Sequence, residues 1–250
     1  MATKKTHLSF REFISNPSGK GSAVNTNSDL ILSNYSNKVD VLEKISYTCY
    51  MNNNGVYYIH FLIPSDSVEG CTYDLVIQLS PGKNPTPLDQ YEVKFFSNDP
   101  AFVFTYAYAY KSHGLLIDFL EKKYTTQTTT SRPSTRNPDN AIGIPKSIYY
   151  AYIVMTKKDL FNSKNVDRFR VVNSHPENVI YNKVRKYAEI ENERSINQKK
   201  YKAKSISLDV EVKNNNLLTR GVRAVAKVSP IRAIKGIGRT VKGVKRTKKF

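Results

Sequence analysis

Residues 217–250 of this 250-residue chain carry the densest set of side chains that could do chemistry. They include no acidic residue and eleven basic ones: Arg220, Arg223, Lys227, Arg232, Lys235, Arg239, Lys242, Lys245, Arg246, Lys248 and Lys249. Ammonium and guanidinium groups at this density bind phosphates by charge. The segment has no Asn or Gln to recognise base edges and no aromatic residue before Phe250 to stack on a base. We therefore expect it to bind nucleic acid without reading the sequence.

The positive charge of the chain is concentrated in this segment, which we call the basic tail. The formal net charge is +18, whereas residues 1–216 contain 28 basic and 21 acidic side chains, a net of +7. Basic and apolar residues in the tail recur at spacings of three and four, which indicates two amphipathic half-helices joined near Pro230. Like-charge repulsion and the glycines at Gly236, Gly238 and Gly243 oppose helix formation, so we expect the tail to fold only on a polyanion or an anionic surface.

Four interpretations of the basic tail stay open. It binds duplex DNA, it binds RNA, it binds an anionic membrane surface, or it is a solvated segment with no fixed partner. Membrane-surface helices usually carry Trp or Phe at the interface, and the tail has neither before Phe250. We expect nucleic acid to be the partner and keep membrane binding as the less favoured alternative.

Candidate catalytic groups are few in this sequence. His113 and Asp118 could form a general-base pair, but five residues at the start of a helix separate them, which is poor geometry. No Gly-x-Ser-x-Gly motif is present. The remaining carboxylate groupings are typical of a solvated turn and a solvated helix face: Asp66 with Glu69, and Glu189 with Glu191 and Glu193. We expect no catalytic residues and a protein that is not an enzyme.

Metal and disulfide sites are also not indicated. The four histidines are scattered without metal-ligand spacing: His7, His60, His113 and His175. Cys49 and Cys71 are the only cysteines, which leaves either one bridge or two free, half-buried thiols. The N-terminus has no apolar stretch typical of a secretory signal, which favours the free thiols. We expect no metal and no cofactor.

The elements around these residues are predicted mainly by hydrophobic periodicity. Strands are expected over 45–51, 56–63, 72–79 and 91–96, with a hairpin turn at Gly55. Residues 101–110 alternate aromatic and small side chains, which predicts a strand with one aromatic face. That face would be core or, alternatively, a stacking platform for single-stranded nucleic acid. A second Tyr-rich strand is expected over 147–156.

Helices are predicted over 28–44, over 114–123 and from 176 to about 204. The second half of the last helix is nearly all polar, so we expect it to stand clear of the core. Residues 205–212 alternate apolar and polar side chains, which indicates a late strand or a strand donated to a neighbour.

These expectations add up to an α+β fold. Its body would be a Tyr-rich antiparallel sheet or sandwich with flanking helices, an extended N-terminal arm and a basic C-terminal tail. We divide the chain into an arm (1–27), a body (28–175), a long helix with a late strand (176–212) and the tail (213–250).

An unstructured loop as long as the Thr-rich segment 124–145 is uncommon in a compact domain, and such loops are usually functional or disordered. The alternative is a long β arm, because Thr is a good strand former. In either case we expect it to project from the body. We expect residues 1–22 and 125–145 to contact other subunits rather than their own core.

Residues 91–108, 136–138 and 145–151 resemble virion structural proteins of tailed bacteriophages, and residues 16–22 have the same character. The resemblance covers roughly residues 10–155 and leaves out the basic tail. It implies a structural component of the virion, in the head–tail neck or connector, that partners with copies of itself and with other virion proteins. It brings no catalytic residues. The competing interpretation is a free nucleic-acid-binding protein without sequence preference.

Overall fold

We analysed a computed structural model of the chain, which describes residues 7–15, 39–81, 87–135, 137–168, 170–171 and 173–201. All of them belong to one compact unit, Met1–Tyr201. The eleven cations of the basic tail lie outside the described residues. So do the expected late strand at 205–212, most of the expected arm and the first part of the helix expected over 28–44.

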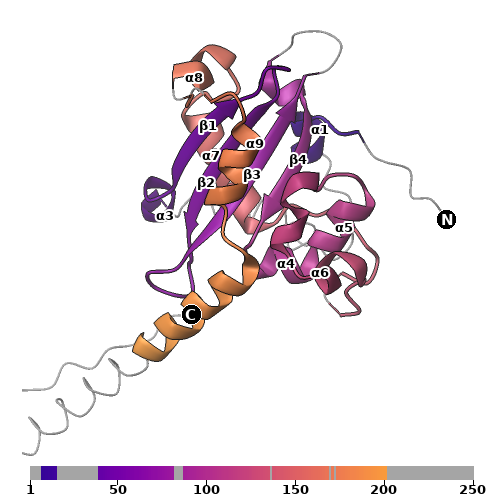
Figure 1. The fold of residues 1–250 in the computed structure, drawn as a ribbon, viewed down its shortest axis with the longest axis vertical. Helices are drawn as coiled ribbons and strands as arrows, with labels where there is room; N and C mark the ends of the chain where they lie inside the picture. The colour runs from indigo at the N-terminus through magenta and orange to yellow at the C-terminus, as the bar shows by residue number, and fades with distance from the viewer. Residues whose placement is uncertain are drawn as a thin grey trace, which may run out of the picture. The chain divides into compact units, whose positions relative to one another are not determined.

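The centre of the fold is a four-stranded antiparallel sheet (Figure 1). Its strands are β1 (Ser46–Met51), β2 (Tyr57–Pro64), β3 (Thr72–Ser80) and β4 (Glu92–Ser97), and they lie side by side in chain order. Gly55 has φ +74° in the turn between β1 and β2, a conformation that glycine adopts without strain. The four strands predicted between residues 45 and 96 are therefore confirmed. Apolar alternation and turn residues together specify them.

Helices flank this sheet, so the α+β class is also confirmed. Figure 1 shows α9 crossing in front of β2 and β3 and α7 behind the sheet. The helical elements are α1 (Phe10–Ser15), α3 (Val39–Glu43), η1 (Leu88–Gln90), α4 (Pro100–Thr105), α5 (Ala107–Ser112), η2 (Asp118–Lys123), α6 (Thr126–Thr130), α7 (Lys146–Lys157), α8 (Ser163–Arg168) and α9 (Pro176–Lys183). Helical backbone resumes at 187 and continues to 201.

One face of the sheet forms the main core. Cys49, Ile59, Ile77 and Phe95 are cross-strand neighbours in one row, and all four are fully buried. The Phe95 ring packs against α1 through Phe13, with 4.6 Å between ring centroids. Tyr110 of α5 contacts the same Phe95 ring, and Tyr152 of α7 contacts Phe10 of α1, so aromatic contacts link the sheet to α5 directly and to α7 through α1.

Residues 7–15 are the described part of the segment 1–22 that was expected to contact other subunits, and they pack on their own core instead. Phe10 and Phe13 are buried inside the core cluster, and the backbone N–H of Phe10 donates to the Tyr91 carbonyl. Leu8 also pairs with β4, through its carbonyl and the N–H of Val93. Two aromatic residues three apart suffice to anchor a single helical turn, even in a polar segment.

The strand expected over 101–110 was wrong, because this segment forms α4 and α5. Asp99 caps α4 by accepting a hydrogen bond from the Ala101 N–H at 3.0 Å, and Pro100 occupies the first helical turn. Phe102, Tyr106 and Tyr110 are buried at a spacing of four, whereas Phe104 is 49% exposed. Aromatic residues at every second position also include residues four apart, which is a helical spacing. The Asp99 cap then favours the helix.

The strand expected over 147–156 was also wrong, because α7 occupies this segment. Its side chains are buried on nearly every side, including Ile148, Tyr150, Ala151, Val154 and Met155. A helix packed on several sides has no polar stripe, so its sequence lacks the helical period and reads like a buried strand.

The segment 124–145 does not project from the body as expected. Tyr124, Ile142 and Ile144 are buried in the core cluster. The Asn137 side chain donates to the carbonyls of Thr105 and Ala141 at 3.0 and 2.9 Å, which fastens the segment to the end of α4. The described part of 124–145 therefore packs on its own body. Some of the threonines that suggested a β arm form helix α6.

The long helix expected from 176 to about 204 is broken. Helix α9 ends at Lys183, residues 184–186 are not helical, and the next helix starts at 187. In that second helix, Ile190 is buried against Val68, Cys71 and Tyr73. Residues 198–201 are exposed, as expected for its polar end.

We predict that Phe13→Ala lowers the free energy of unfolding by about 3–4 kcal/mol, because it removes a buried ring from the core. Arg11→Ala, on the exposed side of α1, should change it by less than about 1 kcal/mol. Chemical denaturation measures both values. Equal denaturation midpoints for Phe13→Ala and the unmodified protein would show that α1 is not part of the core.

Candidate functional site

The sequence-predicted site residues divide into those outside the described residues and those that the fold separates. The basic tail belongs to the first group. His113 and Asp118 belong to the second: the His113 ring lies 3.3 Å from the Asn140 carbonyl, whereas Asp118 pairs with Lys94 at 2.9 Å. The fold therefore gives these two residues different partners and does not form the general-base pair.

Metal-ligating and thiol groups do not gather into a site in the part of the chain that the structure describes. No three His, Cys, Asp or Glu side chains there are arranged to hold a metal ion. Cys49 and Cys71 are free and buried. Burial raises the pKa of Cys49 to about 12, so this thiol stays protonated at neutral pH and is a poor nucleophile. None of the described helices is long and apolar enough to cross a membrane.

The second face of the sheet carries a buried polar network centred on Asp74. The Oδ1 atom of Asp74, on β3, lies 2.8 Å from Nε2 of His60 on β2. Its Oδ2 atom accepts from Nε of Arg185 at 2.9 Å and from Nδ2 of Asn98 at 2.8 Å. Asp74 is 1% exposed, so this carboxylate exchanges nearly all of its hydration for three protein donors.

These donors keep Asp74 ionised. Burial alone raises the pKa of its carboxyl, but the hydrogen bond from His60 and the charge of Arg185 outweigh burial, so the pKa lies below its ordinary value. An ionised carboxylate accepts hydrogen bonds, so Nε2 of His60 carries the proton in this pair.

Arg185 lies in the break between α9 and the next helix, and its guanidinium joins β3 to that next helix. Besides Asp74, it donates from Nη1 to Glu193 at 2.9 Å and from Nη2 to the carbonyl and hydroxyl of Thr72 at 2.9 and 3.1 Å. The Arg185 carbonyl accepts from Asn98 Nδ2 at 3.2 Å. These contacts hold the non-helical residues 184–186 against β3, the end of β4 and the next helix.

Two further polar contacts hold α9 on the same face of the sheet. Glu177, in its first turn, accepts hydrogen bonds from the Tyr58 hydroxyl and from Asn52 Nδ2, both at 2.8 Å. Burial raises the pKa of Glu177, but these hydrogen bonds outweigh it and the pKa is lowered. Lys183, in the last turn, donates to the Tyr50 hydroxyl at 3.0 Å.

A cleft of about 400 Å³ opens beside this network, which we call the α9 cleft. It lies where β1, β2 and β3 meet the end of α9. Its lining residues are Ser46, Tyr47, Thr48, His60, Leu62, Thr72, Asp74, Lys183 and Arg185. Most of these side chains are hydrogen-bond donors, and Lys183 and Arg185 are cations. The cleft is of the size that small-molecule sites in proteins have.

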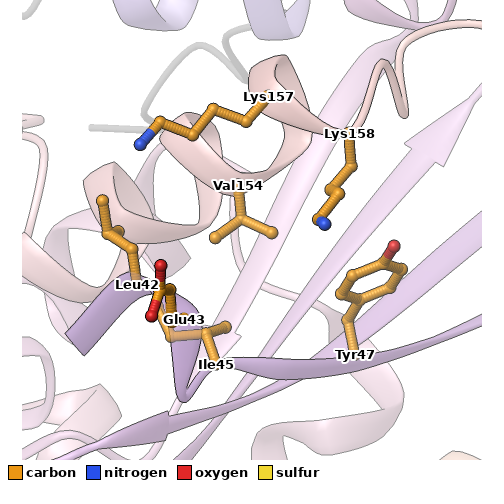
Figure 2. A pocket seen from close by; sticks show the side chains of 7 residues that line it. All are labelled: Leu42, Glu43, Ile45, Tyr47, Val154, Lys157 and Lys158. Atoms are coloured by element: carbon orange, nitrogen blue, oxygen red, sulfur yellow. The ribbon is translucent and has the colours of Figure 1, made fainter. Parts of the chain in front are cut away.

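A second cleft, of about 480 Å³, lies on the α7 side of β1 (Figure 2). Leu42, Ile45 and Val154 supply its apolar wall, and Lys157 and Lys158 extend from the end of α7 on either side of Val154. Its remaining lining residues are Glu43 and Tyr47. A carboxylate and two exposed lysines at an open apolar surface do not define one ligand chemistry.

The sequence analysis did not single out Asp74 or Arg185, and it treated His60 only as one of four scattered histidines. A signal was present: Thr48, His60 and Asp74 each interrupt a strand that is otherwise mostly apolar. Ionisable residues in the middle of a strand of a small sheet are buried unless that face is open to water. The covering segment, with Arg185, comes more than a hundred residues later, so its pairing with Asp74 depends on tertiary structure.

Comparison of the chain with protein-family models, with curated proteins and with solved structures gives no match.

We predict that Asp74→Asn lowers the free energy of unfolding at pH 7 by about 3 kcal/mol, because Arg185 loses its buried counter-charge. The variant should also lose acid sensitivity. The pKa of Asp74 is lower in the folded than in the unfolded chain, so its stabilisation is complete above the unfolded value of about 3.9 and is lost as the pH falls through the folded value.

Denaturant titrations between pH 6 and pH 2 measure this effect. The free energy of unfolding should fall less steeply with acid in Asp74→Asn than in the unmodified protein. Asp118→Asn is the matched control, because Asp118 forms an ion pair while its side chain is 87% exposed. If Asp74→Asn and Asp118→Asn have the same stability and the same acid dependence, Asp74 does not stabilise the fold as an ion.

Proposed function

We propose that this protein is a non-enzymatic structural protein that binds nucleic acid through its basic tail, residues 217–250, while its α+β body binds neighbouring subunits. One observation carries the proposal: eleven cations and no acidic residue lie in this stretch. Phosphate contacts from such a segment provide affinity for any nucleic acid, because each phosphate that a cation neutralises releases condensed counterions.

The body supports a structural role through the way its ionisable groups are used. Asp74, Glu177 and Arg185 hold α9 on the sheet. Asp66, considered at first as part of a carboxylate pair, accepts hydrogen bonds from Lys146 and Tyr150 at 2.8 and 3.0 Å. These side chains stabilise the packing of elements, which suits a protein that presents a binding segment on a folded support.

The resemblance to tailed-bacteriophage virion proteins suggests where such a protein would act. We propose the head–tail neck or connector of a virion, where a ring of subunits surrounds passing DNA. The alternative is a free nucleic-acid-binding protein that uses the same tail outside any particle. Size measurement in solution, with and without the other virion proteins, distinguishes the two: a large ring or stable incorporation supports the virion role, and a monomer in both conditions supports the alternative.

We predict that the full chain binds duplex DNA with a strong salt dependence. If about six cations of the tail contact phosphates, the logarithm of the association constant should fall with the logarithm of salt concentration at a slope of about −5. Duplexes of unrelated sequence should bind with the same affinity within about threefold, because no base edge is read. Fluorescence anisotropy at several salt concentrations gives both numbers.

Deletion of residues 217–250 is the matching test. It should abolish DNA binding and leave the circular dichroism spectrum and unfolding midpoint of the body unchanged. DNA binding that survives the deletion, or that is insensitive to salt, would contradict the proposal. Binding to anionic vesicles but not to DNA of similar charge density would support the membrane alternative.

A further inference from the structure

We propose that the α9 cleft is a binding site for a phosphate group carried by a small organic molecule or by a nucleic-acid backbone. This inference rests on the described residues alone and does not depend on the function proposed for the basic tail. Some donors and acceptors in the cleft already have partners within the protein, and others do not.

The donors of the cleft exceed the partners that the protein supplies. Lys183 has three ammonium protons, and within the described part of the chain it donates one of them to the Tyr50 hydroxyl. Within the same part of the chain, the hydroxyls of Ser46 and Thr48 line the cleft without a protein hydrogen bond. Three groups on two elements, β1 and α9, can therefore donate to one ligand.

The carboxylate of the cleft, in contrast, is occupied. Asp74 is the one carboxylate among the lining residues, and it already accepts from His60, Asn98 and Arg185. The positive charge of Arg185 is balanced by Asp74 and Glu193. Among the described residues, Lys183 is then the lining cation without a carboxylate partner, which favours an anion over a cation as the ligand.

The arrangement of these donors favours phosphate among anions. Ser46 and Thr48 both point from the same face of β1, and His60 is the cross-strand neighbour of Thr48 on β2. Lys183 reaches the cleft from α9, so donors approach from the floor and from one wall. A phosphate has three or more oxygens that accept from different directions, which matches donors on separate elements.

The cleft is larger than a phosphate ion needs. Its volume is about 400 Å³, and Leu62, with 38% of its surface exposed, contributes an apolar part of the lining. A ligand that fills it would place a sugar or a base edge against Leu62 and its phosphate against Lys183, Ser46 and Thr48. Nucleoside monophosphates and single nucleotides of a strand both have this composition.

The test is isothermal titration of the full-length protein with inorganic phosphate, adenosine 5′-monophosphate, adenosine and a dinucleoside monophosphate. Phosphate and the phosphate-bearing ligands should bind, and adenosine should not. Lys183→Met should weaken binding about tenfold, because it removes a charged donor, and Thr48→Val about threefold. Lys186→Met has the same net charge as Lys183→Met, and Lys186 does not line the cleft, so binding should stay within twofold.

This design distinguishes binding in the α9 cleft from binding to the basic tail. If the ligands bind the tail, Lys183→Met should have no effect or the same effect as Lys186→Met. Thr48→Val keeps shape and charge, so it tests the site even if Lys183→Met is unstable. Tighter binding of the monophosphate than of the diester assigns the site to free phosphate esters, and the reverse assigns it to a nucleic-acid backbone. No binding of any phosphate ligand, or equal losses in Lys183→Met and Lys186→Met, would overturn the proposal.

Discussion

The buried carboxylate of Asp74 is the constraint on which the arrangement around the sheet depends. An ion that is almost completely removed from water requires a counter-charge and several hydrogen-bond donors. The sheet supplies His60, the end of β4 supplies Asn98, and Arg185 arrives from the far end of the chain. Arg185 lies just after α9, which ends at Lys183, so its pairing with Asp74 ties the end of α9 to the sheet.

The two faces of the sheet therefore have different roles. The face toward α1, α5 and α7 is an aromatic core, in which Phe13, Phe95 and Tyr110 contact one another. The face toward α9 combines apolar packing with ions, and its charged side chains hold elements in place. Hydrophobic packing tolerates small shifts, whereas a buried ion pair does not. The ion pair therefore defines the position of α9 more precisely than apolar packing alone would. The α9 cleft lies beside that rigid network.

This arrangement separates two kinds of anion contact within one protein. The basic tail offers many cations at close spacing, which suits a long polyanion and any of its sequences. The α9 cleft offers the Lys183 ammonium with the hydroxyls of Ser46 and Thr48 at defined positions, which suits a single phosphate. The first property follows from composition, and the second requires residues from β1, β2 and α9 to meet.

The sequence alone determined the α+β class, the four strands and their turns, and the concentration of charge in the tail, because each follows from local periodicity or composition. Residues 101–110 and 147–156 show where local patterns are insufficient: aromatic residues at every second position also satisfy a helical spacing, and a helix buried on all sides shows no period. The Asp99 cap and the packing against the sheet selected helices there. The pairing of Asp74 with Arg185 and the packing of Phe13 against Phe95 were decided only by tertiary structure, because both join residues that are far apart in the chain.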